Sequence, residues 1–355
     1  MNAIRIVIML LSIVSITGCK KFSRDYIPPE TPHEKKWTVT TVAGNGAPIF
    51  ANGNVLAASF RAPLDVAVSD EGIIYVADAL NHRIRKILEG QVSVYAGDQV
   101  ADTISGDKSS ARFLLPSYLD IDSNGDLYVL DVNDPRVRKV SASGLVSIVA
   151  GSGVDGFADG SAETARFGKE CAGIAIDESG NIYVSDWRNR RIRKISPDGI
   201  VSTYAGNGQS GLVNGSAGSA QFFNAGGLVI DKQGNLYVGD FNRIRKISPD
   251  GIVSTFAGQD SEGYKDGPGD IALFSSIVDL TIDDSGNIYA SDQNRIRKIS
   301  PQGIVSTIAG GEGGYKDGDG ISAQFNGPTG LAIDKFGNIY VADDLNNRIR
   351  EISFQ

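Results

Sequence analysis

A unit of about 50 residues recurs six times between residues 37 and 355, and this repetition restricts the fold more than any other feature. The last copy reads GLAID, GNIYVAD and NNRIREIS between Gly330 and Ser353. These segments alternate apolar and polar residues and are rich in Ile, Val and Tyr, so they predict β-strands. The turn from Asp334 to Gly337 has the residues of a tight hairpin and predicts that the first two strands pair antiparallel.

The copies keep a strict register, which predicts how the strands are arranged. A fourth strand, GIVSTFAG in the copy from Gly251 to Gly258, follows the third. An aspartate closes the second strand of every copy, at positions 78, 131, 186, 240, 292 and 343. Four strands per repeat at this period predict an all-β fold, a six-bladed β-propeller of four-stranded antiparallel blades.

The two ends of the repeat array are out of phase with each other. The last copy stops after its third strand, whereas the array begins with an unattached fourth-type strand from Trp37 to Gly44. Pairing of Trp37–Ala43 with Arg348–Ser353 would complete the sixth blade and remove two exposed sheet edges. We therefore predict that the amino-terminal strand closes the ring.

The repeated motifs resemble a known family. GLAID, GNIYVAD, NxRIRKIS and VSTxAGxG are similar to NHL repeats, and the likeness covers residues 37–355. Proteins with these repeats include amidating lyases, RNA-binding regulators, extracellular adhesion proteins and sensor domains of bacterial kinases. The resemblance therefore implies a propeller and leaves its function open.

The first 36 residues predict export and a lipid anchor. Residues 1–18 have one arginine followed by a short apolar run, the pattern of a lipoprotein signal peptide. The tetrapeptide ending at Cys19 resembles a bacterial lipobox, which implies cleavage before Cys19 and its acylation; an ordinary signal peptide with an incidental cysteine is the alternative. Residues 19–36 are rich in proline and charge and predict a disordered tether. Lys20 after the cysteine resembles the sorting context of the outer membrane, so we expect a protein anchored to the cell envelope only through its lipid.

Charge and histidine content exclude two classes of function. The chain has 34 basic and 42 acidic residues, a formal net charge of −8, which argues against nucleic-acid binding. The resemblance to NHL repeats includes the amidating lyases as one possible class of function, and those enzymes use a histidine-ligated zinc. This chain has only His33 and His82 and cannot assemble that set. We assign no catalytic residue.

Residues that recur in every blade are interpreted as scaffold. Each third strand carries two arginines, and we expect an arginine to pair with the aspartate that closes the neighbouring strand. The aspartates of the first hairpin turns, such as Asp334, are expected to accept backbone N–H groups.

Residues that break the repeat are the candidates for binding. Blade three has a one-residue insertion at Phe167–Cys171 and a tryptophan in its second-to-third loop, which should lie on the same face. We predict a recognition patch, here called the blade-three patch, of Lys169, Glu170, Trp187, Arg188 and Arg190. An aromatic position in the long connections adds Phe157, Tyr264 and Tyr315 to the candidate ligand-binding residues, although packing over the blade tops would also explain these rings.

Three acidic residues break the pattern of the innermost strands. Asp65, Asp120 and Asp279 replace glycine or small apolar residues near the predicted axis, which suggests a site for a divalent cation such as calcium. Solvated channel residues are the alternative.

The sequence favours a binding scaffold for a protein, small-molecule or glycan ligand in the envelope. The other hypothesis is an enzyme, either a metal-assisted, lactonase-like hydrolase or a lyase, with a carboxylate-lined central channel.

Overall fold

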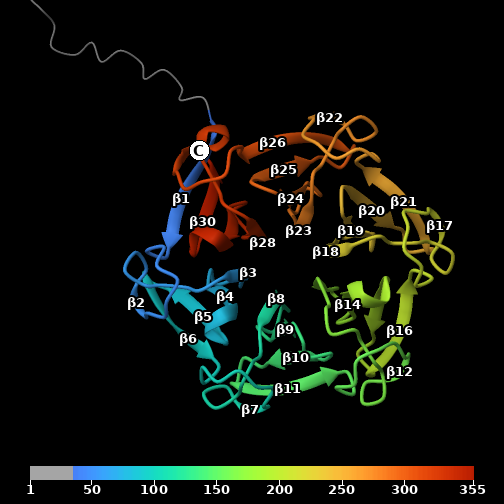
Figure 1. Cartoon of the computed structure of the whole chain (residues 1–355), viewed down its shortest axis with the longest axis horizontal. Coiled ribbons are helices and arrows are strands. Elements are labelled where there is room, and N and C mark those ends of the chain that lie inside the picture. The colour runs from blue at the N-terminus through green and yellow to red at the C-terminus, as the bar shows by residue number, and fades with distance from the viewer. Residues whose placement is uncertain (1–34) are drawn as a thin grey trace, which may run out of the picture. The chain divides into compact units, whose positions relative to one another are not determined.

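The computed structural model describes residues 35–355, which form six β-sheets arranged as the blades of a closed ring (Figure 1). This confirms the predicted all-β, six-bladed propeller. The expected signal peptide, the lipidation site at Cys19 and all of the tether except Lys35 and Lys36 lie outside the described residues.

Four strands of each blade correspond to the four predicted from the sequence. The innermost strands are β3 (Pro63–Val68), β8 (Pro116–Ile121), β13 (Ile174–Ile176), β18 (Ala225–Ile230), β23 (Ile277–Ile282) and β28 (Pro328–Ile333). The second strands are β4 (Ile74–Asp78), β9 (Leu127–Asp131), β14 (Ile182–Asp186), β19 (Leu236–Asp240), β24 (Ile288–Asp292) and β29 (Ile339–Asp343). The third strands are β5 (Arg83–Leu88), β10 (Val137–Val140), β15 (Arg191–Ile195), β20 (Arg243–Ile247), β25 (Arg295–Ile299) and β30 (Arg348–Phe354). The fourth strands are β6 (Gln91–Ala96), β11 (Leu145–Ala150), β16 (Ile200–Ala205), β21 (Ile252–Ala257), β26 (Ile304–Gly310) and, in blade six, β1 (Trp37–Ala43).

Each blade also has a fifth strand that the sequence did not predict. These two-residue strands are β2 (Gly53–Asn54), β7 (Gly106–Asp107), β12 (Gly160–Ser161), β17 (Gly215–Ser216), β22 (Gly267–Pro268) and β27 (Gly318–Asp319). They belong to the long connections between blades, and each pairs antiparallel with the fourth strand of the blade that it leads into. The connection thus covers part of an outer sheet edge that would otherwise be exposed. The prediction of four-stranded blades is correct for the main strands and lacks this edge strand.

The amino-terminal strand closes the ring as predicted. In blade six the strand order is β27-β1-β30-β29-β28, so β1 lies between two segments from the other end of the array. The pairing of β1 with β30 runs from Trp37 opposite Phe354 to Ala43 opposite Ile349. Two further backbone hydrogen bonds join Lys36 and Gln355. Figure 1 shows β1 in blue beside β30 in red.

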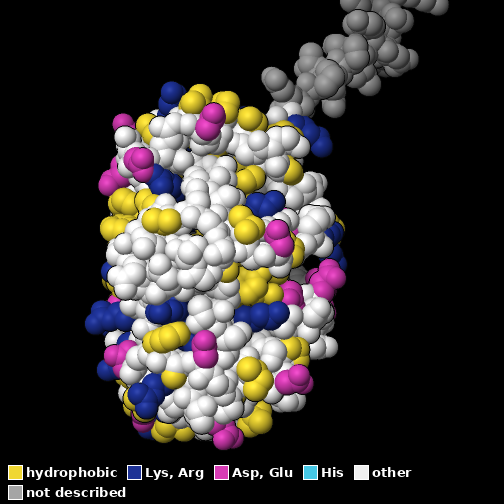
Figure 2. Space-filling view, turned by 90° about the vertical axis from the view of Figure 1, so that its right-hand side faces the viewer, with side chains coloured by type: hydrophobic (Ala, Val, Ile, Leu, Met, Phe, Trp, Pro, Cys, Tyr) yellow, Lys and Arg dark blue, Asp and Glu magenta, His cyan; other side chains and the backbone are white. Residues whose placement is uncertain are grey.

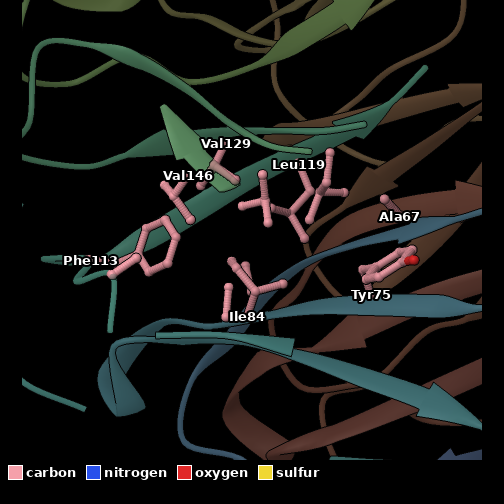
Figure 3. Packing of buried hydrophobic residues seen from close by; sticks show 12 residues of the cluster. Ala67, Tyr75, Ile84, Phe113, Leu119, Val129 and Val146 are labelled. Atoms are coloured by element: carbon pink, nitrogen blue, oxygen red, sulfur yellow. The ribbon is translucent and has the colours of Figure 1, made fainter. Parts of the chain in front are cut away.

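The hydrophobic core lies in layers between neighbouring blades. Between blades one and two, Ala67, Tyr75 and Ile84 of one blade pack against Phe113 and Leu119 of the next (Figure 3). The phenylalanine at this position of every repeat is almost completely buried, at residues 60, 113, 167, 222, 274 and 325. Each blade therefore contributes to two layers, and closure of the ring leaves no terminal layer exposed.

The two faces of the ring are built from different connections. The loop face carries the second-to-third loops, such as residues 187–190, and the long connections, such as residues 206–224. The hairpin face carries the first-to-second turns, such as residues 177–181, and the third-to-fourth turns, such as residues 196–199. Seen from the side, hydrophobic, basic and acidic side chains are interspersed over the ring (Figure 2).

The only helices among residues 35–355 are four single-turn 3₁₀ helices, η1 (Ala79–Asn81), η2 (Trp187–Asn189), η3 (Gly320–Ser322) and η4 (Asp344–Asn346). None of the helices in this part of the chain has the length and apolar character needed to cross a bilayer.

Candidate functional site

The repeated arginines form a buried scaffold, as predicted. The second arginine of each pair, at positions 85, 138, 193, 245, 297 and 350, is among the largest fully buried side chains. Its guanidinium contacts the aspartate that closes the second strand at 2.6 to 2.9 Å in five blades and at 3.8 Å in blade two. The same guanidinium donates to backbone carbonyls of the long connection, for example from Arg245 to Gln221 and Val213. Because these groups hold each blade to its connection, they are not free to bind a ligand.

The blade-three patch is assembled from two segments that the fold brings into contact. Arg188 Nη1 lies 3.4 Å from Glu170 Oε2. Gly168 allows this approach, because a Cβ there would collide with the Cβ of Arg188. Lys169 and Arg188 are exposed, and Trp187 is half-buried. The predicted patch residues on the insertion and on η2 therefore do lie side by side on the loop face.

Further hydrogen bonds fix the patch to the rest of the loop face. Asn189 Nδ2 donates to Gly156 O at 2.8 Å, next to Phe157. The guanidinium of Arg190 donates to Phe223 O of blade four at 2.8 Å. Asp186, which precedes the η2 turn, accepts the Gly168 N–H at 3.0 Å and pairs with the buried Arg193. These contacts anchor the turn to the blade. The patch is thus rigidly positioned although it is exposed.

The three predicted aromatic residues are exposed on the loop face, each on its own blade. Phe157, Tyr264 and Tyr315 are 43%, 43% and 45% exposed. Each ring stacks on the first arginine of its blade, with 3.9 Å from Phe157 to Arg191, 3.7 Å from Tyr264 to Arg295 and 3.8 Å from Tyr315 to Arg348. Only Phe157 belongs to blade three, so the structure joins it to the patch and places Tyr264 and Tyr315 on blades five and six.

The axial carboxylates link neighbouring blades. Asp65 Oδ2 accepts the Leu119 N–H at 2.7 Å, and Asp120 Oδ2 accepts the Ile176 N–H at 2.9 Å. Asp279 Oδ2 accepts the Leu331 N–H at 2.8 Å. In each case the donor belongs to the innermost strand of the next blade.

The ring makes room for two of these carboxylates with glycines. A Cβ at Gly330 would overlap Asp65, and a Cβ at Gly227 would overlap Asp279. The symmetry break seen in the sequence is therefore partly a packing device, in which a glycine on one blade accepts an aspartate from the next.

The expected cation site is not assembled by this geometry. Within residues 35–355 no group of three or more acidic, histidine or cysteine side chains is arranged to hold a metal ion. Asp65, Asp120 and Asp279 do line one axial cavity of about 230 Å³. They do not form a ligand set, because each carboxylate points an oxygen at a backbone N–H of its neighbouring blade.

Burial strongly shifts the proton affinity of these groups. It raises the pKa of Asp120 to about 7 and that of Asp279 to about 7, against the opposing effect of the backbone N–H groups. Burial and the nearby charge of Asp279 raise the pKa of Asp65 well above its ordinary value. The cavity thus holds three carboxyl groups that ionise much less readily than exposed aspartates.

A larger cavity on the hairpin face was missed by the sequence analysis. It has a volume of about 850 Å³ and spans blades three to five, with Tyr183, Lys194, Tyr204, Tyr237 and Lys246 in its lining. Tyrosine and lysine recur at these positions in nearly every repeat. Because repeated residues were interpreted as scaffold, these side chains were not among the predicted ligand-binding residues. A comparison of the residues that flank them in each blade would have revealed the difference.

Comparison with known proteins gives matches both to the repeat and to the whole ring. Residues 60–87 match the model of the NHL repeat. Teneurin-3 of Mus musculus is 27% identical over 368 residues, which cover 89% of this chain and 13% of teneurin-3. The chain thus spans about an eighth of the length of that relative.

Solved structures share the fold at low identity. A protein of unknown function from Bacteroides thetaiotaomicron has a TM-score of 0.71 at 19% identity, covering 91% of this chain and 77% of that one. An auxiliary nutrient binding protein from Bacteroides ovatus has a TM-score of 0.67 at 18% identity, covering 91% and 78%. The chain thus contains a match to the NHL repeat at residues 60–87 and shares the β-propeller fold of these solved structures.

Proposed function

We propose that this propeller is a binding scaffold of the cell envelope that captures a partner protein through the blade-three patch. The observation that carries the proposal is the contact between the insertion and the η2 turn, which presents Trp187 and Arg188 beside Glu170 on a rigid base. Tryptophan and arginine are the residues that most often dominate binding energy at protein interfaces. The remaining blades supply the frame.

The chemistry of the ring supports binding rather than turnover. The buried arginines of the scaffold are paired with aspartates, and the axial carboxylates accept hydrogen bonds from backbone amides. The similar structure from Bacteroides ovatus is an auxiliary nutrient binding protein, which agrees with a binding role for this ring shape. Because the sequence identity is low, this similarity is evidence for a shared fold only.

The matching turns of other blades provide a control for the patch. Arg188 occupies the position that Leu80 takes in η1 and Leu345 takes in η4. Pull-down from detergent-solubilised native membranes should recover a partner with the wild-type chain. The Trp187→Ala, Arg188→Ala double variant should lose that partner, whereas Leu80→Ala and Leu345→Ala should retain it.

Equal recovery by all variants would show that the blade-three patch is not the binding site. The loss expected for the double variant is at least about tenfold in affinity, because removal of a hot-spot residue typically costs about 2 kcal/mol or more.

The proposed location depends on the lipid anchor at Cys19. Two or more acyl chains would hold the protein stably on a membrane. Metabolic labelling with radioactive palmitate should mark the wild-type chain and leave Cys19→Ser unlabelled and released from the membrane fraction. Membrane association of Cys19→Ser at the wild-type level would overturn this part of the proposal.

A further inference from the structure

The cavity on the hairpin face has the dimensions of a ligand site. Its volume of about 850 Å³ lies within the roughly 300–1,000 Å³ typical of small-molecule sites. It is formed by turns of blades three, four and five, drawn from green to orange in Figure 1. Three isoleucines, at positions 176, 230 and 282, line both this cavity and the axial cavity, so it adjoins the end of the channel. It lies on the face opposite the blade-three patch.

The tyrosines of the second strands are buried in these blades, Tyr183 against Tyr204 and Tyr237 against Phe256, and the blades differ in whether a tryptophan of the next blade also packs there. In blade six, Trp37 is the first residue of β1 and lies where the other blades have the glycine of a turn, such as Gly199. Trp37 packs edge-on against Tyr289 of blade five, with ring centroids 6.3 Å apart, and lies 6.0 Å from Lys298 Nζ. The corresponding groups Tyr183 and Lys194 line the open cavity instead.

Two lysines in the cavity have no carboxylate partner within the described residues. Lys194 Nζ lies 5.6 Å above the Tyr183 ring, and Lys246 Nζ lies 5.5 Å above the Tyr237 ring. Neither forms an ion pair with any residue between 35 and 355. The equivalent lysine of blade two, Lys139, instead contacts Asp126 at 2.8 Å.

The difference between the blades comes from one position in the first hairpin. Where blade two has Asp126, blades three and four have Asn181 and Asn235. Each asparagine donates to the aspartate of its own turn, at 2.7 Å in blade three and 2.8 Å in blade four. The lysine ammonium groups therefore keep free donors, which a ligand in the cavity could use.

The lining as a whole disfavours a strongly charged ligand. It contains three lysines, at positions 194, 232 and 246, and five acidic residues, at positions 177, 178, 231, 283 and 284. A polyanion would meet the excess of carboxylates, and a polycation would meet the lysines. Hydrogen-bond donors and acceptors thus alternate around half-buried tyrosine rings such as Tyr204, which packs edge-on against Tyr183 at 5.0 Å.

From this arrangement we infer that the hairpin-face cavity is a binding site for a neutral oligosaccharide. A sugar ring has an apolar C–H face that can lie on a tyrosine and an edge of hydroxyl groups that both donate and accept. Lysine donors, aspartate acceptors and asparagine amides at the rim match that edge. The site is additional to the proposed protein-binding surface and stands independently of it, since it shares no residue with the blade-three patch.

The chain offers matched controls for a test of this site. Tyr204 and Tyr95 occupy the same position in blades three and one, and each packs edge-on against the tyrosine of its second strand. Lys246 and Lys298 likewise occupy the same position in blades four and five. Only Tyr204 and Lys246 line the cavity.

The test uses the propeller on an array of neutral α-glucan, β-glucan, xylan, mannan, galactan and fructan oligosaccharides, with oligogalacturonate as the acidic comparison. We expect binding to at least one neutral class, confirmed by calorimetry. Tyr204→Ala and Lys246→Ala should each weaken it at least about tenfold. Tyr95→Ala and Lys298→Ala should change it less than about twofold, and the far-ultraviolet circular dichroism of all four variants should match the wild type.

Three results would overturn the inference. They are binding to no neutral oligosaccharide on the array, binding to oligogalacturonate alone, and binding that Tyr204→Ala and Lys246→Ala leave unchanged while both remain folded. If the membrane pull-down fails with the double variant at Trp187 and Arg188 and sugar binding persists, the two sites are shown to be separate.

Discussion

Blades four and six have the same architecture but are built from different parts of the chain. Blade four is formed by β17 to β21 in one continuous segment, whereas blade six combines β27 to β30 with β1 from the other end. The strand registers are nevertheless equivalent. Arg245 faces Thr255 in blade four, and Arg350 faces Thr41 in blade six, with a bulge just beyond each pair. A strand supplied from the far end of the chain thus reproduces a blade in detail.

The comparison shows that closure of the ring needs no covalent continuity. Blade six holds its borrowed strand with backbone pairing and with Asp317, which accepts from both the backbone and the hydroxyl of Thr41 at 3.1 Å. The same carboxylate accepts from the buried Arg350 at 2.6 Å. In blade four the amide of Asn214 takes this place. The continuous blades three and five have the same arrangement, with Asp159 and Asp266 in this position, so the closing blade uses a contact that other blades also have.

Removal of β1 should have the largest effect on stability. A chain that begins at Gly44 would lose the buried Val39 and Ala43 and leave both β27 and β30 with unpaired edges. We expect it to aggregate, or to lose cooperative thermal unfolding followed by circular dichroism. A chain that begins at Lys35 is the control and should unfold like the full-length protein. An unchanged melting temperature without β1 would contradict noncovalent closure as the basis of the fold.

Loss of a buried arginine should be the next largest effect, and it should be similar in the two blades. Arg245→Ala leaves Asp240 buried without its partner, and Arg350→Ala does the same to Asp343. Breaking a buried pair in this way typically costs about 3–5 kcal/mol. Urea denaturation of both variants would measure it. A much smaller loss for Arg350→Ala would mean that blade six is packed more loosely than blade four.

The sequence could predict features that every repeat shares, and it failed where one blade depends on another. The Arg–Asp pairs and the closing strand were predictable because six copies repeat the same residues in the same register. The role of Asp65 was not, since its space comes from Gly330, which lies at the other end of the chain and becomes a neighbour only when the ring closes. The hairpin-face cavity was not predictable either, since its lining combines side chains and turns of three different blades.

The junction between blades five and six should make stability depend on pH more than the junction between blades three and four. Asp279 bonds to Leu331 across the former, while the latter places Gly173 against Gly227. Burial raises the pKa of Asp279 to about 7 in the folded state, above its value of about 3.9 in the unfolded chain. The folded state therefore binds this proton more tightly, and the contribution to stability is greatest below about pH 4 and is lost as the pH rises through 7.

Asp279→Asn should flatten this dependence, because its amide oxygen can still accept the Leu331 N–H without a charge. The free energy of unfolding, measured in urea between pH 5 and 7.5, should fall less steeply than in the wild type, by up to about 1.4 kcal/mol per pH unit. Asp198→Asn, at an exposed turn, is the charge-matched control and should keep the wild-type slope. A slope unaltered by Asp279→Asn would show that this carboxyl is solvated.

The smallest expected effect concerns the one strand position where blades four and six carry opposite charges. Lys246 lies over the Tyr237 ring, but the same position in blade six is Glu351 opposite Tyr340. Burial and the charge of Asp334 raise the pKa of Glu351. The ionised carboxylate is therefore less stable at this position than in water. Glu351→Lys should restore the cation over the ring and stabilise the fold by about 0.5–1 kcal/mol. The melting temperature would measure this gain. The reciprocal variant, Lys246→Glu, should have a lower melting temperature than the wild type. If Glu351→Lys instead destabilises the protein, the carboxylate has a role in holding β1 that Lys246 does not have in blade four, and the equivalence of the two blades ends at this position.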